Sequence, residues 1–276
     1  MLWTCTCSLT LGRCDDSDQT TPIRYLLSFI SLQPAIDLCY IGKSMSATLE
    51  TTTRRVSASP LTPAAFAPFG QVIQNPAKHN AQPALKTVEA NQGTATKWLD
   101  ITQMENFYPL ASSGQQAKCV MNMFVCRPRQ LEGGRLFTVE ILERHPYTPQ
   151  TFVPLGLDRG NRETCFLVIV APTLATGQDA AESTASSDTS RPRGPGQPDM
   201  AHLQAFIARG DQSVTYGAGT WHAPMVVLGE SGVEFVVVQY ANGVAEEDCQ
   251  ETEMLINDGG QGLVVDVGSS EGRSKL

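Results

Sequence analysis

The 276-residue chain is predicted to be mainly β, folded as a sandwich or barrel with a few short helices. Its apolar segments are short, rich in Val, Ile, Phe and Thr, and separated by Gly and Pro. No long segment with helical periodicity competes with them. Many short strands with few helices are typical of sandwiches and barrels. The predicted strands are Gln71–Ile73, Lys118–Arg127, Leu136–Leu142, Gln150–Pro154, Thr164–Val170, Leu203–Ile207, Ser213–Tyr216, His222–Leu228 and Val233–Tyr240.

Two short helices are expected beside this series of strands. The first covers Thr62 to Phe69, because Thr62 is a favourable N-cap, Pro63 suits the first turn and Gly70 suits the C-terminal stop. The second is a closing helix over Glu247–Ile256.

Residues 45–273 are predicted to form a single domain. Residues 1–44 are Cys-rich without clear periodicity, and we interpret them as a disordered extension or a gene-model artefact, with Met45 as the natural start. A targeting peptide is the alternative, although the aspartates within residues 15–18 argue against a mitochondrial one.

Residues 174–198 are low in apolar side chains and contain ATGQDAAESTASSDTSRPRGPGQP. This composition predicts a disordered loop inserted between two strands. A tolerated surface insertion is the favoured interpretation, and a regulatory role is the alternative.

Charge and hydropathy exclude several classes of function. The formal net charge of −8 argues against a nucleic-acid-binding surface. No apolar run is long enough to span a bilayer, and the nearest candidate, Tyr25 to Ile41, is interrupted by Gln33, Pro34 and Asp37. The sequence therefore predicts neither nucleic acid nor membrane as a partner.

The eight cysteines include no Cys-x-x-Cys pair, so neither a zinc ribbon nor a thioredoxin motif is indicated. The four beyond residue 44, Cys119, Cys126, Cys165 and Cys249, are expected to be free thiols, mostly buried in strands, in a reducing compartment.

The chain ends in Ser274-Lys275-Leu276, the tripeptide of the peroxisomal address. The preceding tail, Gly268 to Arg273, is polar and is expected to leave this tripeptide accessible. We therefore expect a peroxisomal location and the peroxisomal import receptor as a partner, with the cytoplasm as the alternative.

A first candidate motif lies where the strand Leu136–Leu142 runs into Glu143-Arg144-His145. If the strand continues through His145, its alternate residues share one face and Arg144 faces the other way. That face would carry Phe137, Val139, Ile141, Glu143 and His145. Interior polar groups must be paired or must coordinate something. The alternative is that the strand ends at Leu142 and that the charged triplet is a solvated turn.

A second candidate motif is Gly217-x-Gly219-x-x-His222, a tight turn that delivers a histidine onto the next strand. The two motifs together resemble the paired motifs of the cupin superfamily. The first has the spacing Glu143-x-His145, four residues, then Gln150. The resemblance implies a cupin-like antiparallel β-barrel, a double-stranded β-helix or jelly roll, in which these four positions line the interior and often hold a metal.

This chain departs from the cupin pattern at two positions. Glu143 stands in place of a histidine, and Gln150 stands in place of the acid. Together with His145 and His222 they form a set of two imidazoles, one carboxylate and one amide. That set could hold a divalent ion such as Ni, Mn, Zn or Fe. A site that is empty or weakly metallated is the equal alternative.

Longer stretches resemble the ureidoglycolate lyase family. They are LTPAAFAPFGQVI at 61–73, ANQGTATKW at 90–98, LERHPYTPQTFVPLG at 142–156 and LQAFIARGDQSVTYGAGTWHAP at 203–224. The resemblance extends from about Leu61 to Val244. It implies a lyase that cleaves (S)-ureidoglycolate to glyoxylate and urea in allantoin degradation.

The resemblance implies three catalytic tasks: taking the hydroxyl proton, supporting the leaving urea nitrogen and anchoring the carboxylate. His145, His222 and Glu143 are the candidate acid–base groups, or ligands if a metal is bound. Gln150 would orient the ureido group through its amide.

Arg127 is the preferred carboxylate anchor, because arginine binds carboxylates in a bidentate manner, and Lys97 is the second choice. A solvated surface charge is the alternative for each of them. Asn91 and Gly93 would shape a loop over the site, or they form a plain turn. Trp221 is expected to pack in the core beside the site.

Three competing functions remain open from the sequence. They are a metal-dependent cupin oxygenase, a non-catalytic cupin that binds small acids, and an amidohydrolase that releases ammonia from the ureido group. Amidohydrolases typically use a His/Asp-rich two-metal site, and this chain has only four histidines, of which His79 and His202 lie outside the motifs and are expected at the surface. Pairing of sheet edges favours a homodimer.

Overall fold

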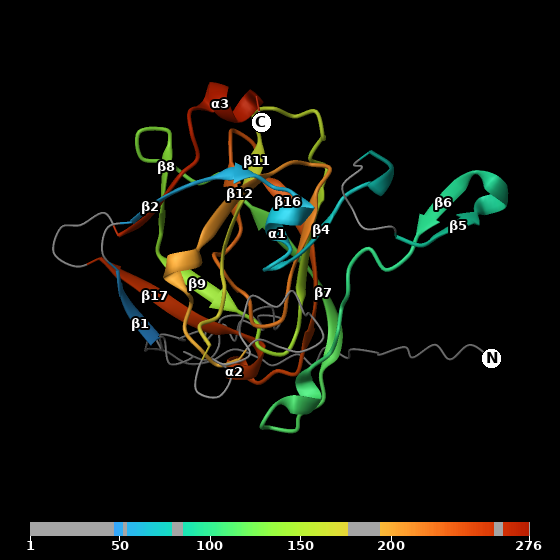
Figure 1. Ribbon diagram of the computed structural model, residues 1–276, viewed down its shortest axis with the longest axis horizontal. Coiled ribbons are helices and arrows are strands. Elements are labelled where there is room, and N and C mark those ends of the chain that lie inside the picture. The colour runs from blue at the N-terminus through green and yellow to red at the C-terminus, as the bar shows by residue number, and fades with distance from the viewer. Residues whose placement is uncertain (1–46, 52–53, 79–84, 176–193, 257–261, 276) are drawn as a thin grey trace, which may run out of the picture. The chain divides into compact units, whose positions relative to one another are not determined.

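The computed structural model describes residues 47–51, 54–78, 85–175, 194–256 and 262–275, all within one unit, Asp37–Leu276 (Figure 1). The predictions for residues 1–44, for most of the 174–198 insertion, for His79 and for Leu276 lie outside these residues.

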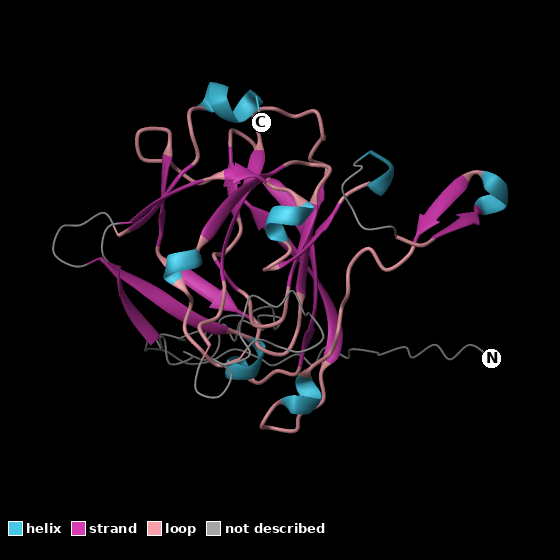
Figure 2. Cartoon of the chain, viewed as in Figure 1, coloured by secondary structure: helices cyan, strands magenta, loops and turns pink. Residues whose placement is uncertain are grey.

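The mainly β prediction is confirmed, because strands make up much of the described chain (Figure 2). The strands are β1 Ala47–Thr51, β2 Arg54–Ser57, β3 Ser59–Pro60, β4 Gly70–Ile73, β5 Thr87–Ala90, β6 Ala95–Trp98, β7 Lys118–Cys126, β8 Leu136–Val139, β9 Ile141–Arg144, β10 Gln150–Leu155, β11 Cys165–Ala171, β12 Gln204–Ala208, β13 Ser213–Tyr216, β14 Trp221–His222, β15 Val226–Leu228, β16 Val233–Ala241, β17 Gln250–Ile256 and β18 Leu263–Asp266. The helices are α1 Pro63–Phe66, α2 Ala245–Asp248 and α3 Ser270–Lys275, with 3₁₀ turns η1 Pro76–Lys78, η2 Asn91–Gly93, η3 Tyr108–Leu110 and η5 Met200–His202.

Two large sheets organise the fold. The eight-stranded sheet has the order β1-β17-β9-β14-β11-β12-β3, with β15 paired to β11, and the five-stranded sheet has the order β4-β13-β10-β16-β7. A three-stranded sheet β2-β18-β8 and the hairpin β5-β6 complete the pairing. Neither large sheet returns to its own first strand within the described residues, so their hydrogen bonding forms open sheets there.

The strand β11 divides the core in two, because all seven of its residues are buried. Phe166, Val168 and Val170 pack against residues of the five-stranded sheet such as Phe152 and Phe235, and we call this cluster the inter-sheet core. The alternate residues of β11 pack on the opposite face, with side chains of β8 and β18 in a second cluster, the rear core. A continuous apolar run is the expected sequence of a strand buried on both faces.

The short helix after Leu61 forms as expected, although it spans only Pro63–Phe66. The Thr62 hydroxyl accepts a hydrogen bond from the Ala65 amide, which confirms the predicted N-cap. Gly70 begins β4, and a Cβ there would lie 1.9 Å from the carbonyl oxygen of Thr215. Only glycine therefore fits at this position.

The predicted closing helix over Glu247–Ile256 is wrong. The helix α2 ends at Asp248, and Gln250–Ile256 forms the strand β17 between β1 and β9. Thr252 and Met254 are buried while the glutamates beside them are exposed, so the segment has the period of a strand. Its pairing with strands distant in the sequence overrides a weak helical preference.

The single strand predicted to run from Leu136 through His145 is interrupted at Glu140. β8 pairs with β18, whereas β9 pairs with β17 and β14. The interruption shifts the alternation by one residue, so Leu142 follows Phe137 and Val139 into the rear core. The expectation that Glu143 shares a face with Phe137 and Val139 is therefore wrong.

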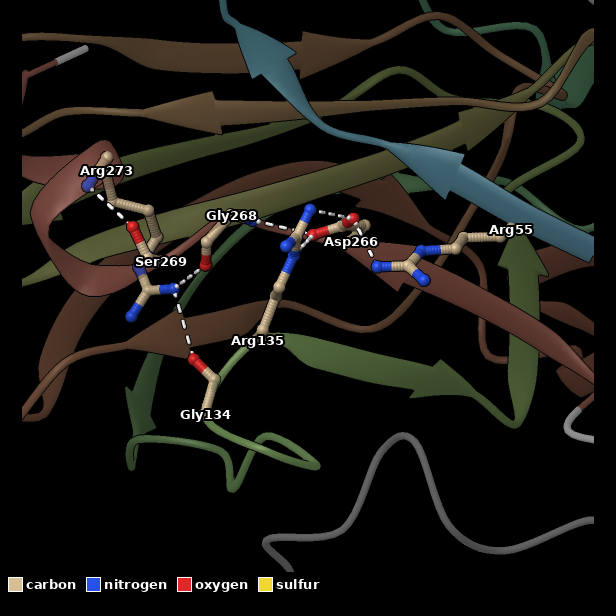
Figure 3. Close-up of polar contacts among 8 residues, drawn as sticks. Arg55, Gly134, Arg135, Asp266, Gly268, Ser269 and Arg273 are labelled. Atoms are coloured by element: carbon tan, nitrogen blue, oxygen red, sulfur yellow. Dashed lines mark hydrogen bonds and ion pairs between the residues drawn. The ribbon is translucent and has the colours of Figure 1, made fainter.

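The chain near its end is held by an ion-pair cluster (Figure 3). The Asp266 carboxylate accepts from Arg135 Nε at 2.5 Å and Nη2 at 2.7 Å, from Arg55 Nη2 at 2.6 Å, and from the Gly268 amide at 3.0 Å. Arg273 of α3 is buried and donates to the Gly268 carbonyl at 2.7 Å. The tail is thus docked at Arg273, whereas Ser269, Ser270 and Glu271 before it are exposed, and the accessibility of the terminal tripeptide stays a prediction.

The thiols differ in environment more than predicted. Cys165 is buried in β11, whereas Cys119 is exposed on β7. In the part of the chain that the structure describes, no helix is both long and apolar enough to cross a membrane.

Candidate active site

Glu143, His145 and His222 converge at one end of the inter-sheet core. β9 and β14 are antiparallel neighbours with Glu143 opposite His222, and Glu143 Oε1 lies 3.4 Å from His222 Nε2. The two imidazole rings are 5.5 Å apart between centroids. Each residue offers one ligand atom, and these atoms all lie within 4.8 Å of one another. The structure thus brings together the three residues that the sequence singled out for acid–base chemistry.

The predicted Gly217–Gly219 turn positions His222. The Thr220 amide donates to the Gly217 carbonyl at 2.9 Å, and Gly219 has a φ of 77°, as glycine readily adopts at the third position of a β-turn. The Gly219 amide also donates to the His145 carbonyl at 2.8 Å. This backbone hydrogen bond joins the two sequence motifs directly.

Backbone carbonyls set the tautomers of both histidines. His145 Nδ1 lies 2.6 Å from the Asp248 carbonyl oxygen, and His222 Nδ1 lies 3.0 Å from that of Thr220. A carbonyl only accepts, so each Nδ1 carries a hydrogen and each neutral ring keeps its lone pair on Nε2. Both Nε2 atoms are buried and have no hydrogen-bond partner within the described structure.

Gln150 adds a further acceptor. It is opposite Tyr216 in the sheet, and the Tyr216 ring stacks on His222 with centroids 4.0 Å apart. Gln150 Nε2 donates to Gln239 Oε1 at 2.6 Å. The Gln150 Oε1 atom is buried and unpartnered among the described residues. Gln239 therefore fixes the orientation of the Gln150 amide.

Burial and mutual charge set the protonation states. Burial raises the pKa of Glu143, but the electrostatic interactions with nearby His222 and then with His145 outweigh it, so the pKa is lowered overall. Burial, and then the neighbouring His222, lower the pKa of His145. Burial and the Glu143 charge raise the pKa of Tyr216. At neutral pH the site therefore holds an ionised Glu143, a neutral His145 and a protonated Tyr216.

These features fit a divalent metal ion. Two imidazole nitrogens and an amide oxygen are buried acceptors without donors, beside the half-buried Glu143 carboxylate, and such orphaned groups are costly unless something binds them. A mixed nitrogen and oxygen set suits Zn, Ni, Fe or Mn. Each imidazole donates its Nδ1 hydrogen to a carbonyl, which is the usual support of a metal-binding histidine.

The structure does not bring the predicted anchoring residues to this group. Arg127 follows β7, which pairs with β16 so that Val120 is opposite Gln239 and Cys126 is opposite Val233. It is exposed and lies roughly 20 Å along the strand from the level of Gln239. The structure therefore does not bring Arg127 to this group, and its role as carboxylate anchor stays a prediction.

Lys97 and Asn91 are exposed on the β5-β6 hairpin, which pairs with no other strand among the described residues. Asn91, Gln92 and Gly93 all have positive φ, so the plain turn interpretation accounts for them. His202 is exposed, as predicted.

Arg144 faces away from the site, as the alternation predicts, but it is buried rather than solvated. Its guanidinium lies over the Trp221 ring at 4.6 Å from the centroid. Burial lowers the pKa of Arg144 to about 10, so the side chain stays charged at neutral pH. Trp221 is buried in the rear core, which confirms the prediction for this residue.

Sequence reasoning missed three residues that orient the site: Asp248, Tyr216 and Gln239. The last was detectable, because Gln239 follows Val233, Phe235 and Val237 at alternate positions of β16 and so continues a buried face. Asp248 acts through its backbone carbonyl, and its side chain accepts from the Tyr108 hydroxyl at 2.6 Å. No residue-type pattern signals a backbone carbonyl.

Comparison with known proteins agrees with the motifs. The sequence model of the ureidoglycolate lyase family matches residues 53–257 of this chain. A ureidoglycolate lyase of Schizosaccharomyces pombe is 38% identical over 71% of this chain and 90% of its own length. The ureidoglycolate lyase of Saccharomyces cerevisiae is 35% identical over 71% of this chain and 92% of its own length. That of Burkholderia mallei is 31% identical over 74% of this chain and 95% of its own length. The chain therefore belongs to the ureidoglycolate lyase family, whose members are enzymes of the lyase class.

Proposed function

We propose that this lyase cleaves (S)-ureidoglycolate to glyoxylate and urea at the group formed by Glu143, His145, Gln150 and His222. The observation that carries the proposal is the convergence of buried, unpartnered acceptor atoms at one end of the inter-sheet core. Relatives over most of the chain are named for the same substrate.

The reaction moves one proton and breaks one bond. The hydroxyl proton of the carbinolamide leaves its oxygen, and the O–H electrons form the carbonyl of glyoxylate. The C–N bond breaks with its electron pair going to nitrogen, which takes up a proton to give urea. The balance needs no water and no oxidant, because the same proton can be returned to the leaving nitrogen.

His222 is the base that we assign to the hydroxyl proton. Its Nε2 carries the lone pair, and Glu143 Oε1 at 3.4 Å stabilises the imidazolium that forms. His145, which stays neutral, accepts a ureido N–H at its Nε2. Gln150 accepts a second ureido N–H at its Oε1. This atom points away from Gln239, because the Gln150 Nε2 group is held by Gln239. Two fixed acceptors thus hold the urea group in line for departure.

In place of these acid–base roles, the same four side chains could act as ligands of a divalent ion. When bound, such an ion would act as a Lewis acid on the substrate hydroxyl and would offset the negative charge of its carboxylate. This suits a site to which the structure brings neither Arg127 nor Lys97.

We also propose that the two large sheets form a cupin-like barrel. The supporting observation is the position of both motifs at one end of the core between the sheets, with the turn amide of Gly219 hydrogen-bonded to His145. The open hydrogen bonding of the sheets shows where this arrangement would depart from a closed ring.

We propose a homodimer from the outer edge of the five-stranded sheet, along which no further strand pairs among the described residues. β7 is the last strand of that sheet, and Met121, Met123 and Val125 on it are exposed. A long edge strand with exposed apolar side chains is a surface that a second copy could cover.

Product analysis tests the proposed reaction. The full chain is incubated with racemic ureidoglycolate, with and without a chelator, and glyoxylate, urea and ammonia are followed over time. We expect glyoxylate and urea in equal amounts from half of the substrate. Ammonia would indicate the hydrolytic alternative, oxygen uptake with bound iron would indicate an oxygenase, and no turnover above the spontaneous rate would leave a binding protein.

A further inference from the structure

Behind the site, on the rear-core face of the eight-stranded sheet, Arg144 is a buried cation without a carboxylate partner among the described residues. Its Nη1 donates to the carbonyls of Gly194 at 2.8 Å and Gly196 at 2.9 Å, and its Nε donates to Gln250 Oε1 at 2.9 Å. Burying a guanidinium costs free energy, and the neutral oxygens and the Trp221 ring offset that cost only in part, so Arg144 adds little net stability to the fold. Its position suggests a different use.

The carbonyls that it gathers belong to residues 194–198, which we call the return segment because they lead from the insertion back to the fold. The Gly196 carbonyl accepts from Arg144 and also from Trp221 Nε1 at 3.2 Å. A Cβ on Gly196 would lie 1.8 Å from the Leu174 carbonyl oxygen, so no other residue fits there.

Further hydrogen bonds hold the return segment and the residues that follow β11, Thr173 and Leu174. The Leu174 amide donates to the Gln197 carbonyl at 2.8 Å, and the Gln197 side chain bonds the Thr252 hydroxyl at 3.2 Å. The Thr173 hydroxyl donates to the Gly219 carbonyl at 2.7 Å, in the turn that leads to His222.

Each anchor flanks a residue of the candidate site. Arg144 stands between Glu143 and His145, and Trp221 stands before His222. Alternation places the anchors on one face of the sheet and the site residues on the other. A shift of the return segment would therefore be transmitted through two short strands to all three acid–base groups.

We propose that Arg144 and Trp221 are positioning residues that clamp the return segment and thereby set the spacing of Glu143 and His145 relative to His222. The insertion is then coupled to the site through its C-terminal end. Only the kinetic test of this inference rests on the proposed function, because kcat is measured for that reaction.

The first test replaces Arg144 by Lys, which keeps the charge but cannot bridge two carbonyls and Gln250 in one plane. The turnover number kcat is expected to fall about 10- to 100-fold with little change in KM, because small misplacements of acid–base groups act on the chemical step. Trp221→Phe, which removes only the indole N–H, should give a smaller loss of the same kind. Arg135→Lys is the matched control, since it weakens the Asp266 cluster at a distance from the site.

A second measurement does not depend on activity. Long-range ¹H–¹⁵N spectra report the ring nitrogens of the four histidines. Arg144→Lys should shift the Nε2 signals of His145 and His222 and leave exposed His202 unchanged. Arg135→Lys should leave all of them unchanged, even where it lowers the melting temperature.

Two deletions separate the return segment from the rest of the insertion. Replacing residues 176–193 by a short Gly/Ser linker should preserve kcat and the histidine signals, whereas replacing 176–197 should reproduce Arg144→Lys. Wild-type histidine signals and kcat in Arg144→Lys would overturn the proposal. If the wild type yields no glyoxylate and urea, the proposed function fails, but the histidine spectra still decide the positioning role.

Discussion

At the scale of single residues, the candidate site depends on which atoms are left without partners. Backbone carbonyls of Asp248 and Thr220 take the Nδ1 hydrogens of His145 and His222, so that both Nε2 lone pairs face the site. Proton transfer and metal binding both need this lone pair. The arrangement is thus prepared before any substrate binds.

Replacement of His222 by Ala should abolish turnover while leaving the fold largely intact. General acid–base groups contribute about 10²- to 10⁴-fold, so kcat should fall by at least that order. The fall is measured as glyoxylate formation beside the melting temperature. His202→Ala is the matched control, because His202 is exposed and lies outside both motifs. Activity retained in His222→Ala would remove His222 from the mechanism.

Replacement of Gln239 by Met should weaken substrate binding through Gln150. The change removes the acceptor of the Gln150 amide, which can then rotate and is left with an unsatisfied buried donor, at a cost of about 1–3 kcal/mol. We expect a KM increase of about 10-fold, from steady-state kinetics, and a lower melting temperature. Gln204→Met, at an exposed position of β12, should change neither. A wild-type KM in Gln239→Met would show that Gln150 does not depend on this contact.

At the scale of elements, the interruption at Glu140 decides what β9 presents to each side. Without it, Glu143 would share a face with Val139 and point into the rear core. The shift lets β8 pair with β18 and lets β9 pair with β14, so that Glu143 is placed opposite His222. A local change of register therefore assembles the site.

The Asp266 cluster, which joins β2, β18 and the loop before β8, predicts an acid-sensitive element. Hydrogen bonding to Arg135, with further contributions from Gly268 and Arg55, holds the pKa of Asp266 well below its usual range. Because the folded pKa is lower than the unfolded one, the stabilisation is present above about pH 4 and is lost as the pH falls toward the folded value.

Asp266→Asn should therefore lower the melting temperature by about 2–6 °C at pH 6, and this difference should shrink between pH 5 and pH 3. Thermal unfolding followed by circular dichroism at each pH measures it. Asp211→Asn, at an exposed carboxylate, is the control. A difference that stays constant or grows toward pH 3 would contradict the role assigned to Asp266.

At the scale of the described unit, the two large sheets enclose the inter-sheet core and leave β7 as a free edge. The exposed side chains of Met121, Met123 and Val125 lie along this edge. Such an edge is open to pairing with another chain unless something covers it. The predicted peroxisomal address stays a prediction, because Leu276 lies outside the described residues.

The double substitution Met121→Lys and Val125→Lys should convert the proposed homodimer into a monomer, because charge on an edge strand opposes pairing. Light scattering during size exclusion should then give a mass near 29.8 kDa instead of twice that value. Gln204→Lys, on the other large sheet, should leave the mass of the wild type. A wild-type chain that is monomeric at every concentration would refute the homodimer.

Many of the strands and most residues of the candidate site could be inferred from local sequence. Short Val- and Ile-rich runs between Gly and Pro predicted most strands of the two large sheets, because strand period and turn residues act over a few positions. The Glu143-x-His145 and Gly217-x-Gly219-x-x-His222 motifs predicted which side chains meet. The position of Arg127 away from the site could not be predicted, because it depends on the β7-β16 pairing.

The sequence by itself determined the mainly β class, the family and the residues of the candidate site. The tertiary structure alone decided the strand identity of β17, the tautomers of both histidines, the Gln150–Gln239 pair and the clamp of Arg144 on the return segment. These features join residues far apart in the chain, such as Gln150 and Gln239, which are 89 positions apart. Propensity and spacing act locally, whereas such contacts exist only once the sheets have packed and excluded water from the groups between them.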